Sequence, residues 1–186
     1  MKKIRKPLKI LLVTNAMILI SAAMLWPIYA LFVEDIGGDL LDASFAGWLF
    51  ALTAGIVTVI SWRYADKIKH ESLILVLWYA IMSIWFFWYI FVDSIMILFI
   101  VQIFIWLWEA IYSPVFDSLY GKHIHKKQRW FEWGLWESTH YFTLAWWAFI
   151  WWLLVNYFGF NSMFILMWVL SLFSALYILC FWKKVL

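Results

Sequence analysis

The sequence predicts an all-α integral membrane protein with six transmembrane helices and with both termini in the cytoplasm. Three observations lead to this prediction. Apolar residues make up 67% of the 186 residues and charged residues 13%, whereas soluble domains are about 45–50% apolar and about 25% charged. Long apolar runs recur along the chain. All 14 Lys and Arg residues fall at the two ends or in every second connection.

A helix that crosses a membrane needs about 20 mostly apolar residues. We expect one domain, residues 1–186, with helices at about 10–33, 43–62, 72–92, 94–119, 137–157 and 161–182. The chain opens like a signal peptide, but its first apolar run is too long for one and ends without a cleavage site. The last run, residues 141–182, is long enough for two spans and is divided by the turn-like NYFGFN at 156–161.

The charges predict the orientation, because Lys and Arg collect in cytoplasmic loops. Five basic residues precede the first expected helix, three follow the second, four follow the fourth and two follow the sixth. The charged residues of the other connections are all acidic: Glu34, Asp35, Asp39, Asp42 and Asp93. We therefore expect the lipid bilayer as a partner and no nucleic acid, since the net charge of +3 reflects this topology.

Tryptophan is abundant where glycine is expected. The chain has 17 Trp and 7 Gly, although membrane helices are usually rich in Gly and carry Trp at the two interfaces. Several Trp lie in mid-span: Trp85, Trp106, Trp108, Trp147, Trp151 and Trp168. We favour the hypothesis that many of these Trp stand for Gly. UGA is read as tryptophan in some bacterial codes and as glycine in others. The alternatives are a deliberate Gly-to-Trp design and a natural aromatic-rich protein.

The connection after the second expected helix carries a recognisable loop pattern. Residues 61–70 read SWRYADKIKH, with the motif positions Trp62, Arg63, Asp66 and Lys67. This resembles the signature loop of the major facilitator superfamily, Gly-x-x-x-Asp-Arg/Lys-x-Gly-Arg/Lys-Arg/Lys. Trp62 stands at the first glycine, Asp66 at the acid and Lys67 at the base. In the family this gating loop packs at the cytoplasmic junction of the two halves.

The fourth expected helix carries a second pattern. Residues 102–110 read QIFIWLWEA, which is similar to the Arg-x-x-x-Gly-x-Gly-x-Ala pattern on the fourth helix of the same family. Gln102 stands in place of the arginine, and Ala110 matches the alanine. Trp106 and Trp108 stand in place of the two glycines.

The fifth expected helix carries a third pattern. Residues 147–152 read WAFIWW, which resembles the Gly-Pro-x-x-Gly-Gly signature of antiporter-type members. Ala148 stands in place of the proline, and Trp147, Trp151 and Trp152 stand in place of the glycines. In the family these glycines allow the helix to bend. The Trp residues of this segment thus again stand at motif-glycine positions.

These patterns, in order and on the matching helices, make the chain similar to the N-terminal half of a major facilitator superfamily transporter. The resemblance covers the whole chain and half of a usual transporter. It implies a six-helix half with a 3+3 inverted repeat and alternating access between two halves. The implied function is secondary active transport of a small solute, such as efflux of a drug or metabolite, in the cytoplasmic (inner) membrane of a bacterium. It implies no cofactor.

Two alternatives belong to other functional classes. The chain could be a non-transporting membrane subunit, or a fragment of a split or full-length transporter. An integral-membrane enzyme is the other, but the sequence contains no catalytic motif and no phosphate-cradling loop. The missing half of a transporter would come from a parallel homodimer or from a second six-helix chain.

Ionisable residues within spans are the first site candidates, because an acid at mid-bilayer costs roughly 2.5–3.5 kcal/mol. Glu109, near the middle of the fourth expected helix, is a candidate substrate or proton site. The alternative is an acid that pairs with a neighbouring helix for packing. Asp117 lies eight residues further, on roughly the same face. We expect Asp117 to hydrogen-bond or ion-pair with the basic loop.

Other polar residues are candidates by the resemblance, in which the first and fourth helices line the central cavity. They are Asn15, Tyr29 and Gln102. The alternative for Asn15 is a hydrogen bond between helices. We expect Pro27 to kink its helix. We expect the histidines of the His123-Ile-His125 loop to be solvated or at a helix end, and the sequence suggests no metal site.

Overall fold

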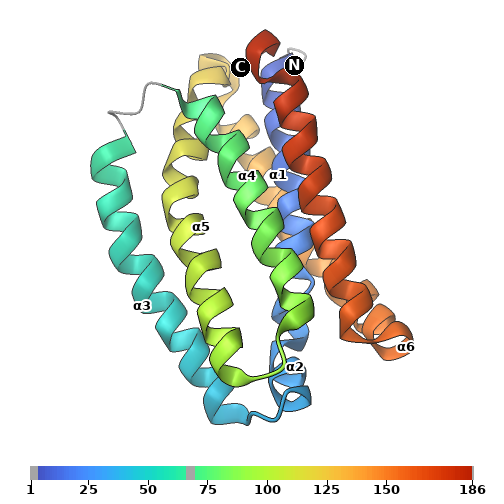
Figure 1. Ribbon diagram of the computed structural model, residues 1–186. Coiled ribbons are helices and arrows are strands. Elements are labelled where there is room, and N and C mark those ends of the chain that lie inside the picture. Colours follow the sequence, from blue (N-terminus) through green and yellow to red (C-terminus); the bar gives the residue numbers. More distant parts are fainter. Residues whose placement is uncertain (1–3, 66–69, 186) are drawn as a thin grey trace.

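The computed structural model describes residues 4–65 and 70–185, and this part of the chain is helical apart from short connections, with no strand (Figure 1). The helices are α1 (Lys6–Ala23), η1 (Trp26–Ile28), α2 (Tyr29–Asp35), α3 (Leu40–Ala65), α4 (Glu71–Trp88), η2 (Tyr89–Phe91), α5 (Ile95–His123), η3 (Lys126–Gln128) and α6 (Arg129–Val185). Five to six helices are long and apolar enough to cross a membrane. This confirms the prediction of an all-α, multi-pass membrane protein.

The first span is broken where the sequence predicts a kink. Residues Lys6–Asp35 form one apolar stretch, but the α-helix stops at Ala23 and continues through the 3₁₀ turn Trp26–Ile28 into α2. Pro27 lies in that turn. Proline has no backbone N–H and its ring clashes with the preceding turn, so it interrupts a helix at this point.

Two glycines end helices with a backbone that other residues rarely adopt. Gly159 has φ 77° and ψ 171° and divides α6 into 129–158 and 160–185. It lies inside the NYFGFN segment, so the predicted turn between the fifth and sixth helices is confirmed. Gly37, with φ 85°, follows α2. Gly37 and Gly38 donate backbone hydrogen bonds to Glu34 and Val33, which is a common way to satisfy the last carbonyls of a helix.

The expected start of the fifth helix is wrong by eight residues. We expected it at residue 137, but α6 begins at Arg129. Its first turns pack against the end of α5, because Glu132 is buried and the ring of Trp133 lies 5.1 Å from that of Tyr120. Similarly, α5 continues to His123 rather than 119. Both helices extend beyond the apolar runs because tertiary contacts cover their polar ends.

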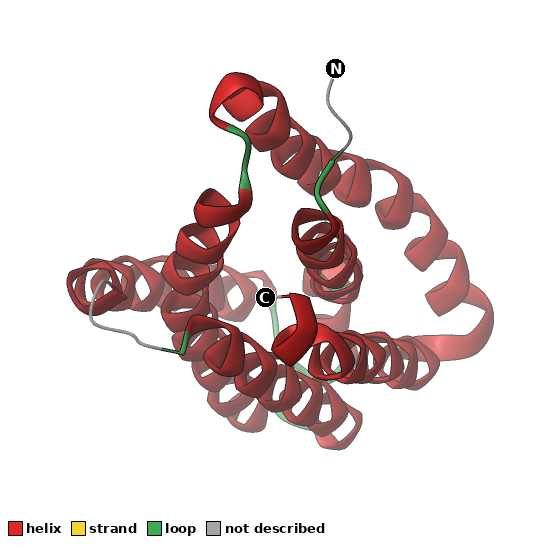
Figure 2. Ribbon diagram, turned by 90° about the horizontal axis from the view of Figure 1, so that it is seen from above, coloured by secondary structure: helices red, strands yellow, loops and turns green. Residues whose placement is uncertain are grey.

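The helices run up and down in a bundle whose two ends differ in charge. The start of α1, the end of α6 and the α5–α6 connection lie at one end (Figure 1). The described basic side chains lie at the start of α1, at the ends of α3 and α5 and in the α5–α6 connection. The opposite end holds the acidic connections around 34–42 and at Asp93. α1 and α4 pack against α6, and α3 and α4 pack against α5. Figure 2, a view along the bundle, shows α6 doubling back on itself.

Aromatic side chains join the spans. Phe164 in α6 packs against Phe32 of α2 and Tyr89 of η2, with ring centroids 5.0 and 5.1 Å apart. α3 is covered least. Of its described side chains only Ala46 is buried, and its outer face shows large apolar residues such as Phe45, Trp48 and Ile56. A helix that is apolar all round fits a lipid environment.

Candidate functional site

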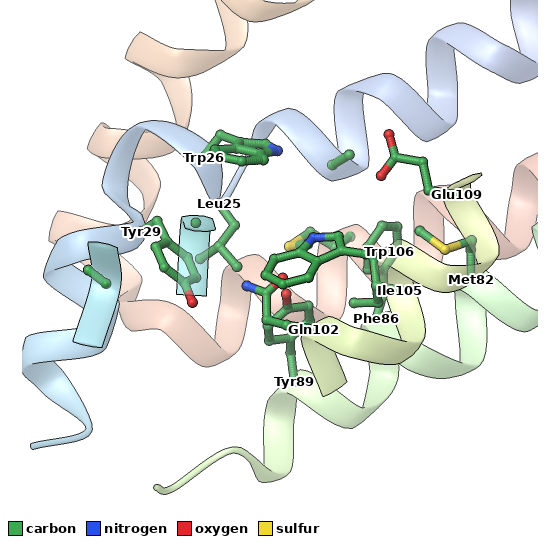
Figure 3. A pocket seen from close by; sticks show the side chains of 14 residues that line it. Leu25, Trp26, Tyr29, Met82, Phe86, Tyr89, Gln102, Ile105, Trp106 and Glu109 are labelled. Atoms are coloured by element: carbon green, nitrogen blue, oxygen red, sulfur yellow. The ribbon is translucent and has the colours of Figure 1, made fainter. Parts of the chain in front are cut away.

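A cavity of about 100 Å³ opens inside the bundle, in the half away from the chain's two ends. It is bounded by the end of the first span, the start of α3, the end of α4 with η2, and the middle of α5 (Figure 3). The lining is Ala22, Leu25, Trp26, Tyr29, Ala43, Gly47, Met82, Phe86, Tyr89, Gln102, Ile105, Trp106, Glu109 and Met167. It is therefore apolar and aromatic with a few polar groups, as solute pockets commonly are.

Three of the predicted site residues meet in this cavity. Tyr29 comes from α2, and Gln102 and Glu109 come from α5 (Figure 3). Gln102 is buried, and its side-chain amide lies close to the buried hydroxyl of Tyr29. A solute in the cavity would meet both polar groups.

Glu109 is the only ionisable acid among the described lining residues. It is the central residue of α5, with 14 residues before it and 14 after it (95–108 and 110–123). It lies at the rim of the cavity and is exposed in the isolated chain. Acids within membrane helices usually face the interior of the bundle or a cavity, and Glu109 lies at such a position.

Trp106 closes one side of the same cavity. Its side chain is 5% exposed, and its ring lies 4.6 Å from that of Phe50 in α3. The indole therefore occupies space between α3 and α5 that a glycine would leave open. The size of the cavity depends directly on which residue stands at position 106.

Asn15 lies outside the cavity, in a hydrogen-bond network between helices. The hydroxyl of Tyr112 donates to Asn15 Oδ1 at 2.6 Å. Tyr79 Oη lies 3.1 Å from the same Tyr112 oxygen, so Tyr79 is the donor of that second bond. All three side chains are buried. The structure thus favours the packing interpretation of Asn15, and the sequence reasoning missed its partners, since neither tyrosine belongs to a motif.

We expect Tyr112→Phe to lower the free energy of unfolding by about 1–2 kcal/mol, because it leaves Asn15 Oδ1 and Tyr79 Oη buried with one hydrogen bond fewer. Denaturation of the purified protein in mixed micelles by increasing SDS measures this. Tyr157→Phe is the matched control, since Tyr157 is 74% exposed. Equal stability of the two variants would contradict the network's role.

Asp117 makes no hydrogen bond or ion pair with the described basic loop, contrary to our expectation. Its Oδ1 is buried without a partner within residues 4–65 and 70–185. The nearby base is engaged elsewhere, because Lys122 Nζ lies 2.7 Å from Glu71 Oε2. Ser118 donates to the other oxygen of Glu71 at 2.7 Å. This pair joins the start of α4 to the end of α5.

The gating-loop motif is described only at its first two positions. Trp62 and Arg63 are exposed at the end of α3. Asp66 and Lys67 lie outside the described residues.

The helix-packing motif positions differ from one another in their surroundings. Trp106, Ala110 and Trp151 are buried, Trp108 and Trp147 are half-buried, and Trp152 is exposed. The backbone carbonyl of Trp108 accepts a hydrogen bond from Trp78 Nε1. Trp147 stacks on Trp151, with ring centroids 5.0 Å apart. Only Trp106 among these residues lines the cavity.

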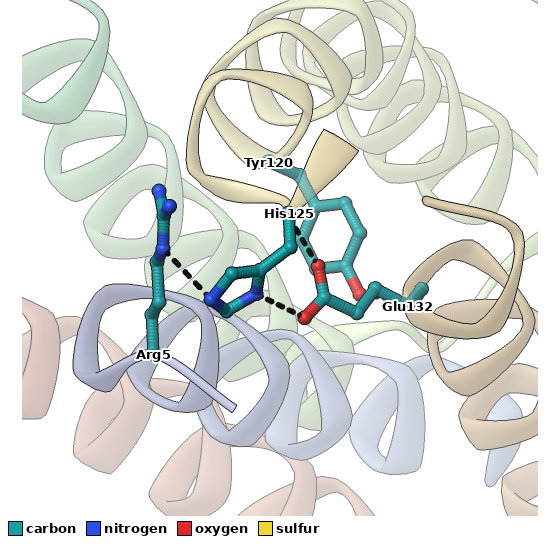
Figure 4. Close-up of polar contacts among 4 residues, drawn as sticks. All are labelled: Arg5, Tyr120, His125 and Glu132. Carbon is teal, nitrogen blue, oxygen red and sulfur yellow. Dashed lines mark hydrogen bonds and ion pairs between the residues drawn. The ribbon is translucent and has the colours of Figure 1, made fainter. Parts of the chain in front are cut away.

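A second polar cluster ties the chain's beginning to the α5–α6 connection. Arg5 Nε donates to His125 Nε2 at 3.1 Å, and His125 Nδ1 lies 2.6 Å from Glu132 Oε1 (Figure 4). The backbone N–H of His125 donates to the other oxygen of Glu132 at 2.6 Å. Tyr120 donates to the Glu132 carbonyl. Of the two alternatives expected for His125, the structure favours the helix end over the solvated loop, because His125 directly precedes η3 and a buried carboxylate holds its ring and backbone.

The described residues contain no group of three or more His, Cys, Asp or Glu side chains arranged to hold a metal ion. Comparisons of the chain with protein-family models, with curated proteins and with solved structures found no match.

Proposed function

We propose that the chain is a secondary active transporter of a small solute, built like one six-helix half of a major facilitator superfamily transporter. The observation that carries the proposal is the cavity that brings Tyr29, Gln102 and Glu109 together. Two different spans supply these three polar groups, and aromatic rings surround them. Such a site within the bundle is what a transporter offers to a solute that crosses by alternating access.

The chemistry of the cavity bears on the kind of solute. Its described lining includes one acid, Glu109, one amide, Gln102, two phenols, and no basic side chain. Aromatic rings from Trp26, Phe86 and Trp106 complete it. This lining favours a neutral or cationic solute over an anion, because an anion would face Glu109 without a compensating positive charge. The cavity volume of about 100 Å³ is below the roughly 300–1,000 Å³ usual for ligand pockets, so it restricts the solute to a small molecule.

Alternating access requires two halves around one site, and we propose a parallel homodimer in the cytoplasmic membrane of a bacterium. The start of α1 and the end of α6 lie at the same end of the bundle (Figure 1), and two copies inserted in the same orientation would form a parallel dimer. Only Ala46 is buried among the described side chains of α3. The outer face of this helix is apolar and available to a second copy. A second six-helix chain would serve the same purpose.

Reconstitution into proteoliposomes tests the proposal. We expect uptake of a neutral or cationic small solute from a screened set, driven by an imposed pH or sodium gradient and absent in protein-free vesicles. Cross-linking in the same vesicles should give a dimer. Transport in vesicles where cross-linking detects only monomers would overturn the proposed dimer.

The second candidate function is a non-transporting membrane subunit that binds a partner. The exposed apolar face of α3 favours it, because a partner helix could pack there. Absence of flux for every solute in the set, together with stable binding of a second membrane chain, would favour this alternative.

A further inference from the structure

A second hollow lies on the surface at the α5–α6 connection, far from the solute cavity. It has a volume of about 420 Å³ and is lined by Lys126, Lys127, Gln128, Arg129, Trp130 and Phe131. These residues form η3 and the first turn of α6, at the end of the bundle where the chain begins and ends (Figure 1). We propose that this hollow binds the phosphodiester headgroup of an anionic phospholipid.

The charge of the hollow fits such a headgroup. Lys126, Lys127 and Arg129 are exposed, and none of them makes an ion pair within the described part of the chain. Three exposed cations therefore lie within four residues without a counterion from the described residues. Phosphate oxygens are strong acceptors for such groups.

The fold removes the nearby negative charge from this surface. Glu132 follows the hollow by one residue, but it is 1% exposed and both its carboxylate oxygens are bound by His125 (Figure 4). The same histidine accepts a hydrogen bond from Arg5, 120 residues earlier in the chain. The cluster therefore buries the carboxylate of Glu132 and holds Arg5, a fourth cation, against the loop that carries the other three.

The aromatic residues favour a lipid over a free phosphate. The side chain of Trp130 is 88% exposed and that of Phe131 is 44% exposed, next to the cations. Trp is typical of the membrane–water interface, where its ring lies at headgroup level. A lipid headgroup with its glycerol and first methylenes would cover these rings, whereas a free phosphate would leave them in water. Basic segments beside a membrane attract anionic lipids in this way.

Lipid titration of the purified full chain in zwitterionic detergent tests the proposal, with bound lipid counted by native mass spectrometry. The ligands are short-chain phosphatidylglycerol, phosphatidylcholine with the same acyl chains, and glycerol 3-phosphate. We expect phosphatidylglycerol to bind most tightly. The variant Lys126→Gln with Lys127→Gln should bind it about 10–30-fold more weakly, from the usual contribution of each cation near an anionic lipid.

The matched control is Lys9→Gln with Arg63→Gln, which removes two other exposed cations. It should change binding by less than about threefold. Equal losses in the two double variants would show unspecific charge attraction and overturn the site. Glycerol 3-phosphate that binds as tightly as phosphatidylglycerol would show a free-phosphate site instead. Because no flux is measured, the result stands apart from the transport proposal.

Discussion

Glu109→Gln should lower the initial rate of solute uptake in proteoliposomes at least about tenfold, the consequence of losing about 1.4 kcal/mol or more of interaction at the cavity. Gln keeps the size of the side chain, removes its charge and replaces one acceptor oxygen by a donor NH2 group. Glu109 is the only acid in the described lining of the cavity. The effect should follow from this charge whether the carboxylate binds a cationic solute or a coupling proton.

The matched control is Glu34→Gln, because Glu34 is an exposed acid of α2 outside the cavity. It should retain uptake within about twofold of the unmodified chain. Rates are compared per amount of protein inserted, so that a loss of expression is not counted as a loss of activity. Full uptake by Glu109→Gln would show that the acid has a packing role and would remove the strongest support for the solute cavity.

The gene should carry UGA at the positions where Trp occupies motif-glycine positions. We expect UGA for Trp106, Trp108, Trp147, Trp151 and Trp152, and UGG for Trp133 and Trp136. Sequencing of the coding region measures this, together with mass spectrometry of the protein from its native cells. In that case the natural protein has glycine at the first five positions. UGG at all seven positions would end the hypothesis, and the chain would be a genuinely tryptophan-rich protein.

The Trp positions named in this hypothesis differ in their surroundings. The indole N–H of Trp151 is buried without a hydrogen-bond partner among the described residues, which costs free energy that a glycine would not incur. Trp133 packs against Tyr120 and Trp136, with ring centroids 5.1 and 6.0 Å apart. The indole N–H of Trp136 is also buried without a hydrogen-bond partner in the part of the chain that the structure describes. Glycine at 106 would enlarge the solute cavity, because Trp106 lines it.

Much of the fold could be predicted because it depends on short stretches of sequence. The break at Pro27 and the turn at Gly159 follow from the backbone chemistry of those two residues. The spans follow from their apolar composition. The start of α6 could not be predicted this way, since Arg129, Glu132 and Gly134 interrupt the aromatic residues of 129–136 and hide the helix in the sequence. In the structure Glu132 is buried against His125.

The candidate site could be predicted only in part. The cost of a charge in a membrane helix pointed to Glu109, and the resemblance pointed to Tyr29 and Gln102; the structure places all three in one cavity. Asn15 and Asp117 were candidates on the same grounds but lie outside the described lining. Which polar side chains share a cavity depends on how each helix is rotated about its axis, and composition carries no information on that rotation.

The sequence by itself thus determined that the chain is a helical membrane protein, where its spans break, and how its charges divide between the connections. These properties arise from the transfer of individual residues between water and lipid and from local backbone preferences. The tertiary structure alone decided that Tyr112 meets Asn15 across 97 residues and that Arg5 meets His125 across 120. Such contacts form only when helices pack, because the geometry of packing brings distant residues within hydrogen-bond range.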